Sequence, residues 1–412
     1  MENDMLIVGE NQYYNMNSHE TGLNNNVLVV GASGAGKTRS IVIPNLLQAS
    51  GSYVVSDPKG NLYQTYGAYL REQGYVVKRL DFTRPKRSVG YNLFRYIHDD
   101  QDIRKVAHML IYTNKKGNHA DPFWDEASQL LLEAIIAYLM EAWGREEQNL
   151  HQVLELIEMC YQEGDFDSGE IAVDLLFKEH KKHHADSQAV HLYNRFRVAA
   201  NNTLRSILIS VNAKLGSYDN PQLARMMEND EIDIASIGRR KTAIFVVVSD
   251  TDRSLDGLVN VFFSQVICEL CRYADLECKG YTLPVPVRLI LDDFATNCKI
   301  EEFPRMIASF RSRGVSTMLM IQAESQLKDS YEEDGRTIIG NCDTYVYLGG
   351  NDVETAEAVA KRCDMPVMKV LNMPVGTNWI FRRGQAAVNG KNLDLEAFLA
   401  KKYIKKENQL GR

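Results

Sequence analysis

The chain has 412 residues, of which 45% are hydrophobic, a size that allows two or three domains with substantial cores. Its net charge of −7 argues against a surface that binds nucleic acid everywhere, although a local basic channel is compatible with it. No apolar run reaches the roughly 18 to 20 residues that span a bilayer, and the first residues lack the pattern of a signal segment. Seven cysteines, an odd number, indicate reduced thiols. We therefore expect a cytoplasmic globular chain.

The strongest motif lies near the N-terminus, where the apolar run 27–30 leads directly into the sequence GASGAGKT at 31–38. This is the full G-x-x-x-x-G-K-[ST] phosphate loop, in which glycines let successive backbone N–H groups turn towards a polyphosphate. Lys37 is expected to reach the β- and γ-phosphates of ATP, and the Thr38 hydroxyl to complete a Mg²⁺ coordination sphere. Ile41 and Val42 would begin a helix whose positive end faces the same charge. The residues predicted to bind the nucleotide are Gly31, Ala32, Ser33, Gly34, Ala35, Gly36, Lys37, Thr38 and Arg39.

Short apolar, β-branched runs recur along the chain, and each ends at polar or glycine residues. Such runs are typical of buried parallel strands, and helical patterns at 62–73, 258–273 and 354–361 lie between them. This alternation predicts a doubly wound, mostly parallel α/β sheet with the ligand at the edge where the strands end. The expected strands cover 27–30, 52–55, 75–80, 243–248, 287–291, 317–321, 344–348 and 378–381.

One interval, from about Asp102 to about Ile232, shows helical periodicity and almost no strand signal. Its apolar spacing predicts helices at 126–140 and 150–160, and the segment 121–125 carries the proline and acids that suit a helix N-terminus. We interpret the interval as an all-alpha domain inserted into the sheet. The predicted domains are residues 1–101 and 233–412, two parts of one nucleotide-binding domain, and the insertion 102–232.

Two carboxylates follow the apolar strand predicted at 287–291. In this Walker B layout Asp292 is expected to hold Mg²⁺ through its water shell, and Asp293 to orient or deprotonate the attacking water. Gln322 follows the strand at 317–321, where its amide can hydrogen-bond both the γ-phosphate and the water. The alternative for Gln322 is an ordinary polar strand end.

Two arginines precede the strand at 317–321. Arg311 and Arg313 are candidates for arginine fingers that cross a subunit interface, because planar guanidinium donors stabilise the charge on a transferring phosphoryl group. The alternative is that both are ordinary surface arginines.

Six segments follow one another along the chain in the order Asn25–Gly31, Ser56–Gly60, Asp121–Trp124, Leu291–Phe294, Phe310–Gly314 and Ile339–Asp343. Taken together, they resemble the coupling-protein ATPases of conjugative type IV secretion, the TraG/TraD class. The resemblance implies a RecA-like P-loop NTPase interrupted by an all-alpha domain and assembled as a homo-hexamer at the cytoplasmic face of the membrane. It further implies that relaxase-bound single-stranded DNA is recruited and driven by ATP into the channel proteins of the secretion system.

The resemblance also implies roles for individual residues. Lys37 and Thr38 take the phosphate and magnesium contacts, Asp292 and Asp293 form the Walker B pair, and Gln322 is the sensor. Arg311 takes the place of the family's trans-acting arginine, with Arg313 as second choice. Asp57 and Lys59 fall in a loop beside the nucleotide, although Asp57-Pro58 fits a helix cap equally well.

Two departures from the family pattern leave alternatives open. The family usually has Glu at the position of Asp293, and family members usually begin with transmembrane helices, for which this sequence shows no apolar run. The shorter carboxylate favours, as one alternative, a nucleotide-binding substrate receptor with little hydrolysis. A related DNA-partitioning or channel-assembly ATPase is the other.

Overall fold

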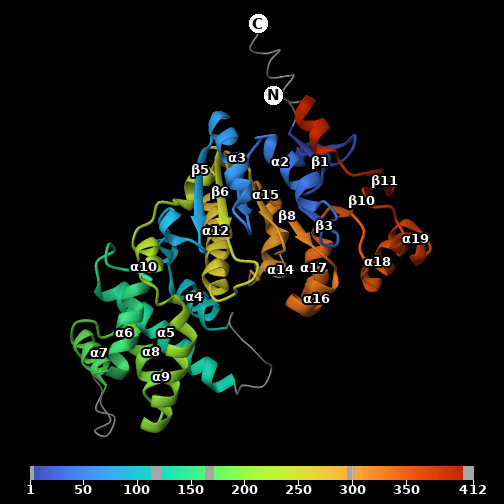
Figure 1. The fold of residues 1–412 in the computed structure, drawn as a ribbon. Helices are drawn as coiled ribbons and strands as arrows, with labels where there is room; N and C mark the ends of the chain where they lie inside the picture. The colour runs from blue at the N-terminus through green and yellow to red at the C-terminus, as the bar shows by residue number, and fades with distance from the viewer. Residues whose placement is uncertain (1–3, 113–121, 163–170, 295–298, 301, 402–412) are drawn as a thin grey trace. The chain divides into compact units, whose positions relative to one another are not determined.

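The computed structural model describes residues 4–112, 122–162, 171–294, 299–300 and 302–401. Two compact units make up the chain (Figure 1). Unit 1 comprises Met1–Arg79, Ile234–Val248 and Ile267–Arg412, and unit 2 comprises Leu80–Asp233 and Ser249–Val266. The longer segment of unit 2 therefore begins before the predicted insertion at 102–232 and ends just after it.

A nine-stranded sheet in the order β11-β10-β9-β3-β8-β7-β4-β6-β5 organises unit 1. The central strands pair in parallel, which confirms the predicted mostly parallel α/β sheet. Each predicted strand is present, with ends shifted by at most two residues. The strands are β3 (Val27–Val30), β4 (Ser52–Ser56), β5 (Val76–Asp81), β6 (Thr242–Val247), β7 (Val287–Leu291), β8 (Val315–Ile321), β9 (Thr344–Tyr347), β10 (Thr377–Arg382) and β11 (Val388–Lys391).

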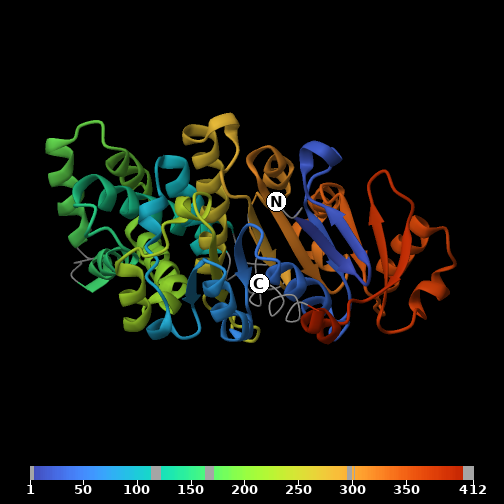
Figure 2. The ribbon, with the colours of Figure 1, turned by 90° about the horizontal axis from the view of Figure 1, so that it is seen from above.

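The last strands of the sheet correct one expectation. The parallel direction predicted for 378–381 is wrong, because β10 runs antiparallel to both β9 and β11. The C-terminal strands, red in Figure 2, form one edge of the sheet. An apolar run carries no information about strand direction, and the helices between β9 and β10 suggest a parallel crossover that the chain does not make. The sequence pattern also predicts neither β11 nor the separate antiparallel pair β1 (Met5–Gly9) and β2 (Gln12–Asn15).

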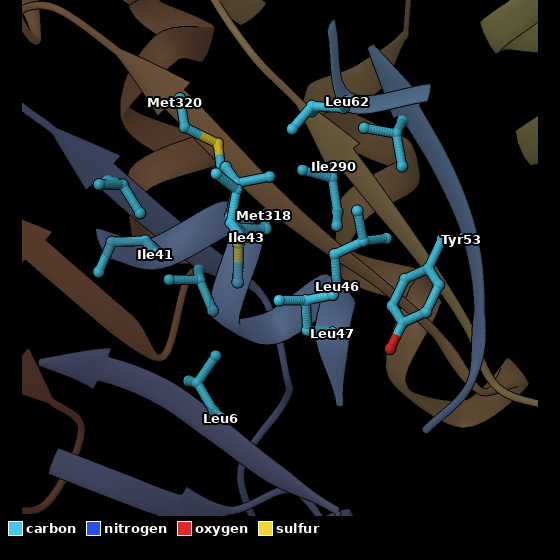
Figure 3. Packing of buried hydrophobic residues seen from close by; sticks show 14 of the residues in the cluster. Leu6, Ile41, Ile43, Leu46, Leu47, Tyr53, Leu62, Ile290, Met318 and Met320 are labelled. Atoms are coloured by element: carbon cyan, nitrogen blue, oxygen red, sulfur yellow. The ribbon is translucent and has the colours of Figure 1, made fainter. Parts of the chain in front are cut away.

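The core of unit 1 lies between the sheet and the helical segment that follows the phosphate loop. Ile41 and Leu46 from this segment pack with Ile290 of β7 and Met318 of β8, and all four are fully buried (Figure 3). Burial of this kind is the main favourable term in folding. The helices of unit 1 are α1 (Ser18–Thr21), η1 (Thr38–Val42), α2 (Ile43–Leu47), α3 (Asn61–Glu72), α11 (Ile234–Ile237), α14 (Phe303–Met306), α15 (Phe310–Arg313), α16 (Ser325–Tyr331), α17 (Gly335–Gly340), α18 (Val353–Cys363) and α19 (Val367–Leu371).

The described residues of the predicted insertion, 102–232, form helices. Over the described part of 102–232 the structure has helices and no strand, as predicted, and α5 begins at Pro122. Asp121, part of the predicted helix start, lies outside the described residues. Within the described ranges, none of the helices is both long and apolar enough to cross a bilayer. The helices here are α4 (Asp100–Tyr112), α5 (Pro122–Ala142), α6 (Leu150–Gln162), α7 (Ala172–His183), α8 (Gln188–Phe196), α9 (Asn201–Leu215) and α10 (Pro221–Glu228), and α12 (Asp256–Glu277) begins in unit 2 and ends in unit 1.

A buried amide joins the N-terminal hairpin to this core. The Asn45 side chain, on α2, accepts a hydrogen bond from the Ile7 N–H at 3.0 Å and donates to the Ile7 carbonyl at 2.7 Å. It also donates to the Ile41 carbonyl at 2.8 Å, and Asn45 is fully buried. One side chain therefore satisfies both backbone groups of Ile7, which would otherwise be buried without partners.

We expect Asn45→Ala to lower the free energy of unfolding of unit 1 by about 2 to 4 kcal/mol, because two backbone groups of Ile7 lose their partner. Urea unfolding monitored by a probe in unit 1 measures the change. The matched control is Asn389→Ala on β11, an exposed position expected to change stability by less than about 0.5 kcal/mol. Equal effects of the two substitutions would contradict the role assigned to Asn45.

Candidate nucleotide-binding site

The parallel register of β3, β8 and β7 brings the predicted site residues to one edge of the sheet. Val30 of β3 pairs with Ile321 of β8, and Leu291 of β7 pairs with Leu319 of β8. The phosphate loop follows β3, the two carboxylates follow β7, and Gln322 follows β8. The carboxyl edge of a parallel sheet is where ligands bind in open α/β folds.

The phosphate loop has the backbone that its glycines allow. Gly34 and Gly36 adopt φ values of +78° and +93°, in the left-handed region that side chains disfavour. Gly31 is limited by space instead, because a Cβ there would lie 2.9 Å from the Leu348 Cβ. The helix begins at Thr38, three residues before the expected start, with the π-helical turn η1. Its first backbone N–H groups therefore lie directly after the loop, as a phosphate site requires.

Lys37 is buried beside the loop. Its Nζ donates hydrogen bonds to the carbonyl oxygens of Gly31 at 2.6 Å and Ala32 at 3.3 Å, so the amine closes the loop on itself. Burial lowers the pKa of Lys37, while Asp293 and Asp292 oppose the shift by favouring the charged amine. The amine is thus held next to both carboxylates, at the position where the motif predicts phosphate oxygens.

Thr38 and Asp292 form the pair predicted to hold Mg²⁺. The Thr38 hydroxyl donates to Asp292 Oδ2 at 3.0 Å. Burial raises the pKa of Asp292, the Asp293 charge adds to the rise, and Thr38 and Lys37 counteract it. A hydroxyl and a carboxylate oxygen at this separation are hard donors of the type that Mg²⁺ prefers, and the pair fits the cation.

Asp293 and Gln322 lie together at the same edge. The Gln322 Nε2 is 3.5 Å from Asp293 Oδ1, at the outer limit for a hydrogen bond, and the Asp293 N–H donates to Asp292 Oδ1 at 3.1 Å. Asp293 adopts a φ of +49°, which is uncommon for a residue other than glycine and places its side chain in a tight turn after β7. The two residues predicted to act on the attacking water are therefore adjacent.

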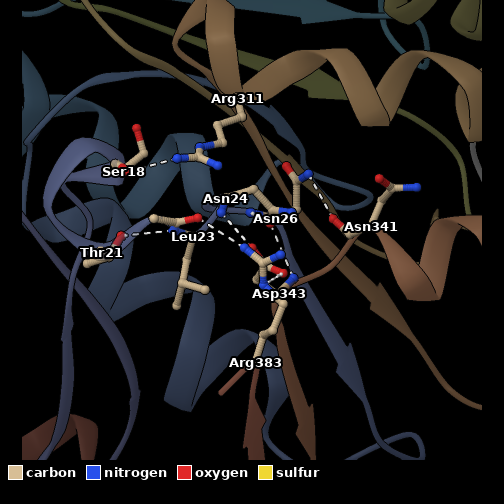
Figure 4. A network of polar contacts seen from close by, with 10 residues as sticks. Ser18, Thr21, Leu23, Asn24, Asn26, Arg311, Asn341, Asp343 and Arg383 are labelled. Carbon is tan, nitrogen blue, oxygen red and sulfur yellow. Dashed lines mark hydrogen bonds and ion pairs between the residues drawn. The ribbon is translucent and has the colours of Figure 1, made fainter. Parts of the chain in front are cut away.

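The two candidate arginines lie elsewhere, before β8 rather than after it. Arg311 Nη2 donates to the Ser18 carbonyl at 3.1 Å (Figure 4), and its side chain is exposed. Arg313 binds Asp275 with two hydrogen bonds, of 2.8 Å and 2.7 Å. Since each strand residue rises about 3.3 Å, the 7 residues of β8 separate these arginines from the phosphate loop by roughly 20 Å. Neither arginine reaches the nucleotide site of its own chain.

Asp57 directly follows β4, is buried, and contacts the first turn of α3. Its Oδ2 accepts the Tyr63 N–H at 2.9 Å, and burial raises the pKa of Asp57 against the lowering effect of these backbone hydrogen bonds. The N-cap residue of α3 is Gly60, and Asp57 supports the helix start from further upstream by accepting a hydrogen bond from its first turn. Among the residues that the structure describes, no hydrogen bond or ion pair joins Lys59 to the site.

The sequence pattern does not predict the contacts that the C-terminal residues make with the phosphate loop. Asn392 Nδ2 donates to the Ala35 carbonyl at 3.3 Å, and Glu396 forms an exposed 2.8 Å ion pair with Arg39. The Gly349 carbonyl also accepts the Ala32 N–H at 2.9 Å. Nothing in the local sequence of these residues signals nucleotide binding, because only folding brings them to the loop.

Known proteins with similar sequences include a VirD4 protein and a conjugal transfer protein. The chain is 24% identical to protein VirD4 of Rhizobium rhizogenes over 348 residues, which cover 81% of this chain and 48% of that protein. It is 24% identical to conjugal transfer protein TraG of Escherichia coli over 353 residues, 81% of this chain and 54% of that protein. The chain spans about half the length of these relatives.

Solved structures share the fold. The bacterial conjugative coupling protein TrwBΔN70 superposes with a TM-score of 0.65 at 17% identity, covering 89% of this chain and 85% of that chain. TrwB has also been solved with the non-hydrolysable ATP analogue ADPNP, and that structure matches with a TM-score of 0.65 at 18% identity. VirB4 of Thermoanaerobacter pseudethanolicus matches with a TM-score of 0.53 at 11% identity over 96% of this chain and 97% of that chain.

The family assignment follows from the sequence over nearly the whole chain. The family model described as Type IV secretory system Conjugative DNA transfer matches residues 2–370. This range contains the phosphate loop, both carboxylates and Gln322. The chain belongs to the conjugative DNA transfer family of type IV secretion systems.

Proposed function

We propose that the chain is an ATP-hydrolysing coupling protein that recruits relaxase-bound single-stranded DNA and passes it to a type IV secretion channel. The observation that carries the proposal is the gathering of Lys37, Thr38, Asp292, Asp293 and Gln322 at one sheet edge in a member of this family. Similar structures of TrwB with ADPNP, and with ADP and Mg²⁺, support nucleotide and magnesium as the ligands.

In the proposed reaction each side chain has a separate task. Lys37 leaves the carbonyl oxygens of its own loop and binds the terminal phosphates. Thr38 and Asp292 hold Mg²⁺, which when bound supplies positive charge against the phosphate oxygens. Asp293 accepts a hydrogen bond from the attacking water and Gln322 orients it, so that water meets the phosphorus in line.

Recruitment of the protein-linked DNA is assigned to unit 2. A cavity of about 680 Å³ there is lined by Phe123, Val198, Arg104 and Arg195. Val198 is 85% exposed and Phe123 is 44% exposed, which leaves apolar surface in a lining that carries two arginines and two glutamates. Exposed apolar side chains beside arginines are typical of protein interaction surfaces.

Loss of the phosphate-loop amine tests the ATPase. We expect Lys37→Ala to lower kcat for ATP by on the order of 100-fold or more, because a charge that stabilises the phosphoryl group is removed. Phosphate release is measured with and without single-stranded DNA, and DNA is expected to stimulate the wild type. The control is Lys369→Ala at an exposed position on α19. Activity of Lys37→Ala equal to that of the wild type would overturn the proposal.

The position of Arg311 makes a mixing experiment decisive. We propose that Arg311 contacts the nucleotide of a neighbouring subunit in a homo-hexamer, whereas the double hydrogen bond to Asp275 retains Arg313 within its own chain. Arg311→Ala and Lys37→Ala, each inactive alone, are expected to regain part of the ATPase activity when mixed. This happens because an intact loop then faces an intact Arg311.

The matched control for this experiment is Arg305→Ala, an exposed arginine on α14 that is expected to stay active alone. No recovery on mixing, with both variants shown to enter the same oligomers by fluorescence energy transfer, would remove Arg311 from the site.

The raised pKa of Asp292 predicts a pH dependence. Since protonation removes the charge that holds Mg²⁺, Mg²⁺-dependent binding of ATP is expected to be full above the raised pKa and to be lost as the pH falls through it. The loss should begin at higher pH than for an ordinary aspartate of pKa about 3.9. Asp293→Asn removes the neighbouring like charge, so its midpoint should move down.

Fluorescence titrations of a labelled ATP analogue, with and without Mg²⁺ at each pH, measure that midpoint. Asp293→Glu keeps the charge and serves as the control. An unchanged midpoint in Asp293→Asn would contradict the coupling between the two carboxylates.

The second candidate is a nucleotide-binding receptor with little hydrolysis, and Asp293 is the residue that favours it. Its carboxylate is one methylene shorter than the Glu of the family pattern, and its hydrogen bond to Gln322 is long. A wild type that binds ATP tightly but gains turnover only as Asp293→Glu would favour this receptor over the ATPase.

A further inference from the structure

Arg288 is a buried cation that has no role in the proposed ATPase reaction. It lies in the second position of β7, opposite Tyr53 of β4 and Ser316 of β8, and is only 5% exposed. Its polar contacts within the described ranges are the Ser316 hydroxyl, 3.5 Å from Nε, and the Met16 sulfur beside Nη2. A guanidinium has five N–H donors, and a hydroxyl and a thioether satisfy few of them. Buried arginines ordinarily pair with a carboxylate, and this one has no such ion pair in the described part of the chain.

A cavity of about 560 Å³ adjoins this guanidinium. It lies in unit 1 at the sheet edge where β4, β7 and β8 begin, opposite the edge that carries the phosphate loop. Besides Arg288, the cavity is lined by His19 and by Arg311 of α15. The Arg311 side chain donates a hydrogen bond to the Ser18 carbonyl (Figure 4). The volume is in the range of pockets that bind small molecules.

The charges of the lining favour an anion. Two guanidinium groups face one carboxylate, that of Asp4, whose Oδ1 is buried and has no hydrogen-bond partner among the described residues. The contacts of Arg288 with Ser316 and Met16 leave guanidinium donors available to a ligand, and Asp4 Oδ1 can accept a hydrogen bond, so a ligand that carries both an anionic group and a hydroxyl suits this lining. Hydroxyl groups of Ser50 and Ser316 also line the cavity.

We propose that this cavity is a second phosphate-binding site of unit 1, with Arg288 as the inner ligand and Arg311 as the outer one. A phosphate monoester that carries hydroxyl groups, such as a sugar phosphate or a nucleotide, satisfies both arginines and Asp4. Two forked cations suit the three terminal oxygens of a phosphate better than the two of a carboxylate. The site lies at the edge of the sheet opposite the phosphate loop of the same chain, so that loop takes no part in it. The phosphate belongs either to a free ligand or to the nucleotide of a second copy of this chain docked at Arg311.

Calorimetric titration of the full chain with ribose 5-phosphate tests the site. Arg288→Met should weaken binding by at least about 10-fold, because a charge-assisted pair is lost, while Lys37→Ala should leave it unchanged. Arg305→Met, at an exposed arginine, is the matched control and should bind as the wild type does. Lys37→Ala disables only the phosphate loop, and Arg288→Met tests only the second site. Failure of the ATPase proposal is therefore distinguishable from failure of the second site.

Thermal unfolding without ligand separates binding from a structural role. Arg288→Met should raise Tm, since an unpaired buried charge is replaced by an apolar side chain of similar length. A lowered Tm together with unchanged ribose 5-phosphate binding would show that Arg288 only supports the fold, which overturns the proposal.

Assembly distinguishes the two sources of phosphate. Saturable binding to the monomer indicates a free ligand. If the monomer does not bind ribose 5-phosphate, ADP-dependent assembly is measured in sedimentation experiments. A weakening of this assembly by about 10-fold in Arg288→Met then identifies the second copy as the source of the phosphate. No effect of Arg288→Met on either measurement would mean that the site does not exist.

Discussion

The parallel register of β3, β8 and β7 is the constraint on which the candidate site depends. The phosphate loop and the two carboxylates are more than 250 residues apart, as the Thr38–Asp292 separation of 254 positions shows. Only the pairing of these three strands brings them within hydrogen-bond distance. A slip of one residue would turn every side chain of a strand to the opposite face, so the buried apolar sequence of each strand fixes the chemistry at its end.

Burial gives this edge its electrostatic character. Lys37 and Asp292 are both shielded from water, and each favours the charged form of the other against the cost of that shielding. The carbonyl oxygens of Gly31 and Ala32 in the loop itself accept hydrogen bonds from the Lys37 amine. Phosphate oxygens would replace these neutral acceptors with charged ones, which form stronger hydrogen bonds with the amine. The exchange therefore favours binding of a nucleotide in the loop.

The opposite edge of the same sheet carries cations without such neighbours. Arg313 is satisfied by Asp275, but Arg311 has a carbonyl and Arg288 a hydroxyl and a thioether. One sheet thus presents a phosphate loop with carboxylates at one edge and arginines at the other. In a ring of copies these edges can face each other, which is how a site built from two subunits arises in the proposed hexamer.

The sequence alone determined the phosphate loop, the eight predicted strands and the helical nature of the insertion, because these are encoded by local spacing of glycine and apolar residues. It could not determine the direction of β10, the hairpin of β1 and β2, or the contact of Asn392 with the loop, since a strand's partner is absent from its local pattern. Asp57 fitted two roles in the sequence, and only the folded chain shows that its carboxylate accepts a hydrogen bond from the first turn of α3. Likewise, Arg288 is an ordinary residue of an apolar strand in sequence. Only tertiary packing shows that Arg288 is buried beside a cavity and forms no ion pair with a carboxylate in the described part of the chain, because burial and partnership are properties of the folded chain.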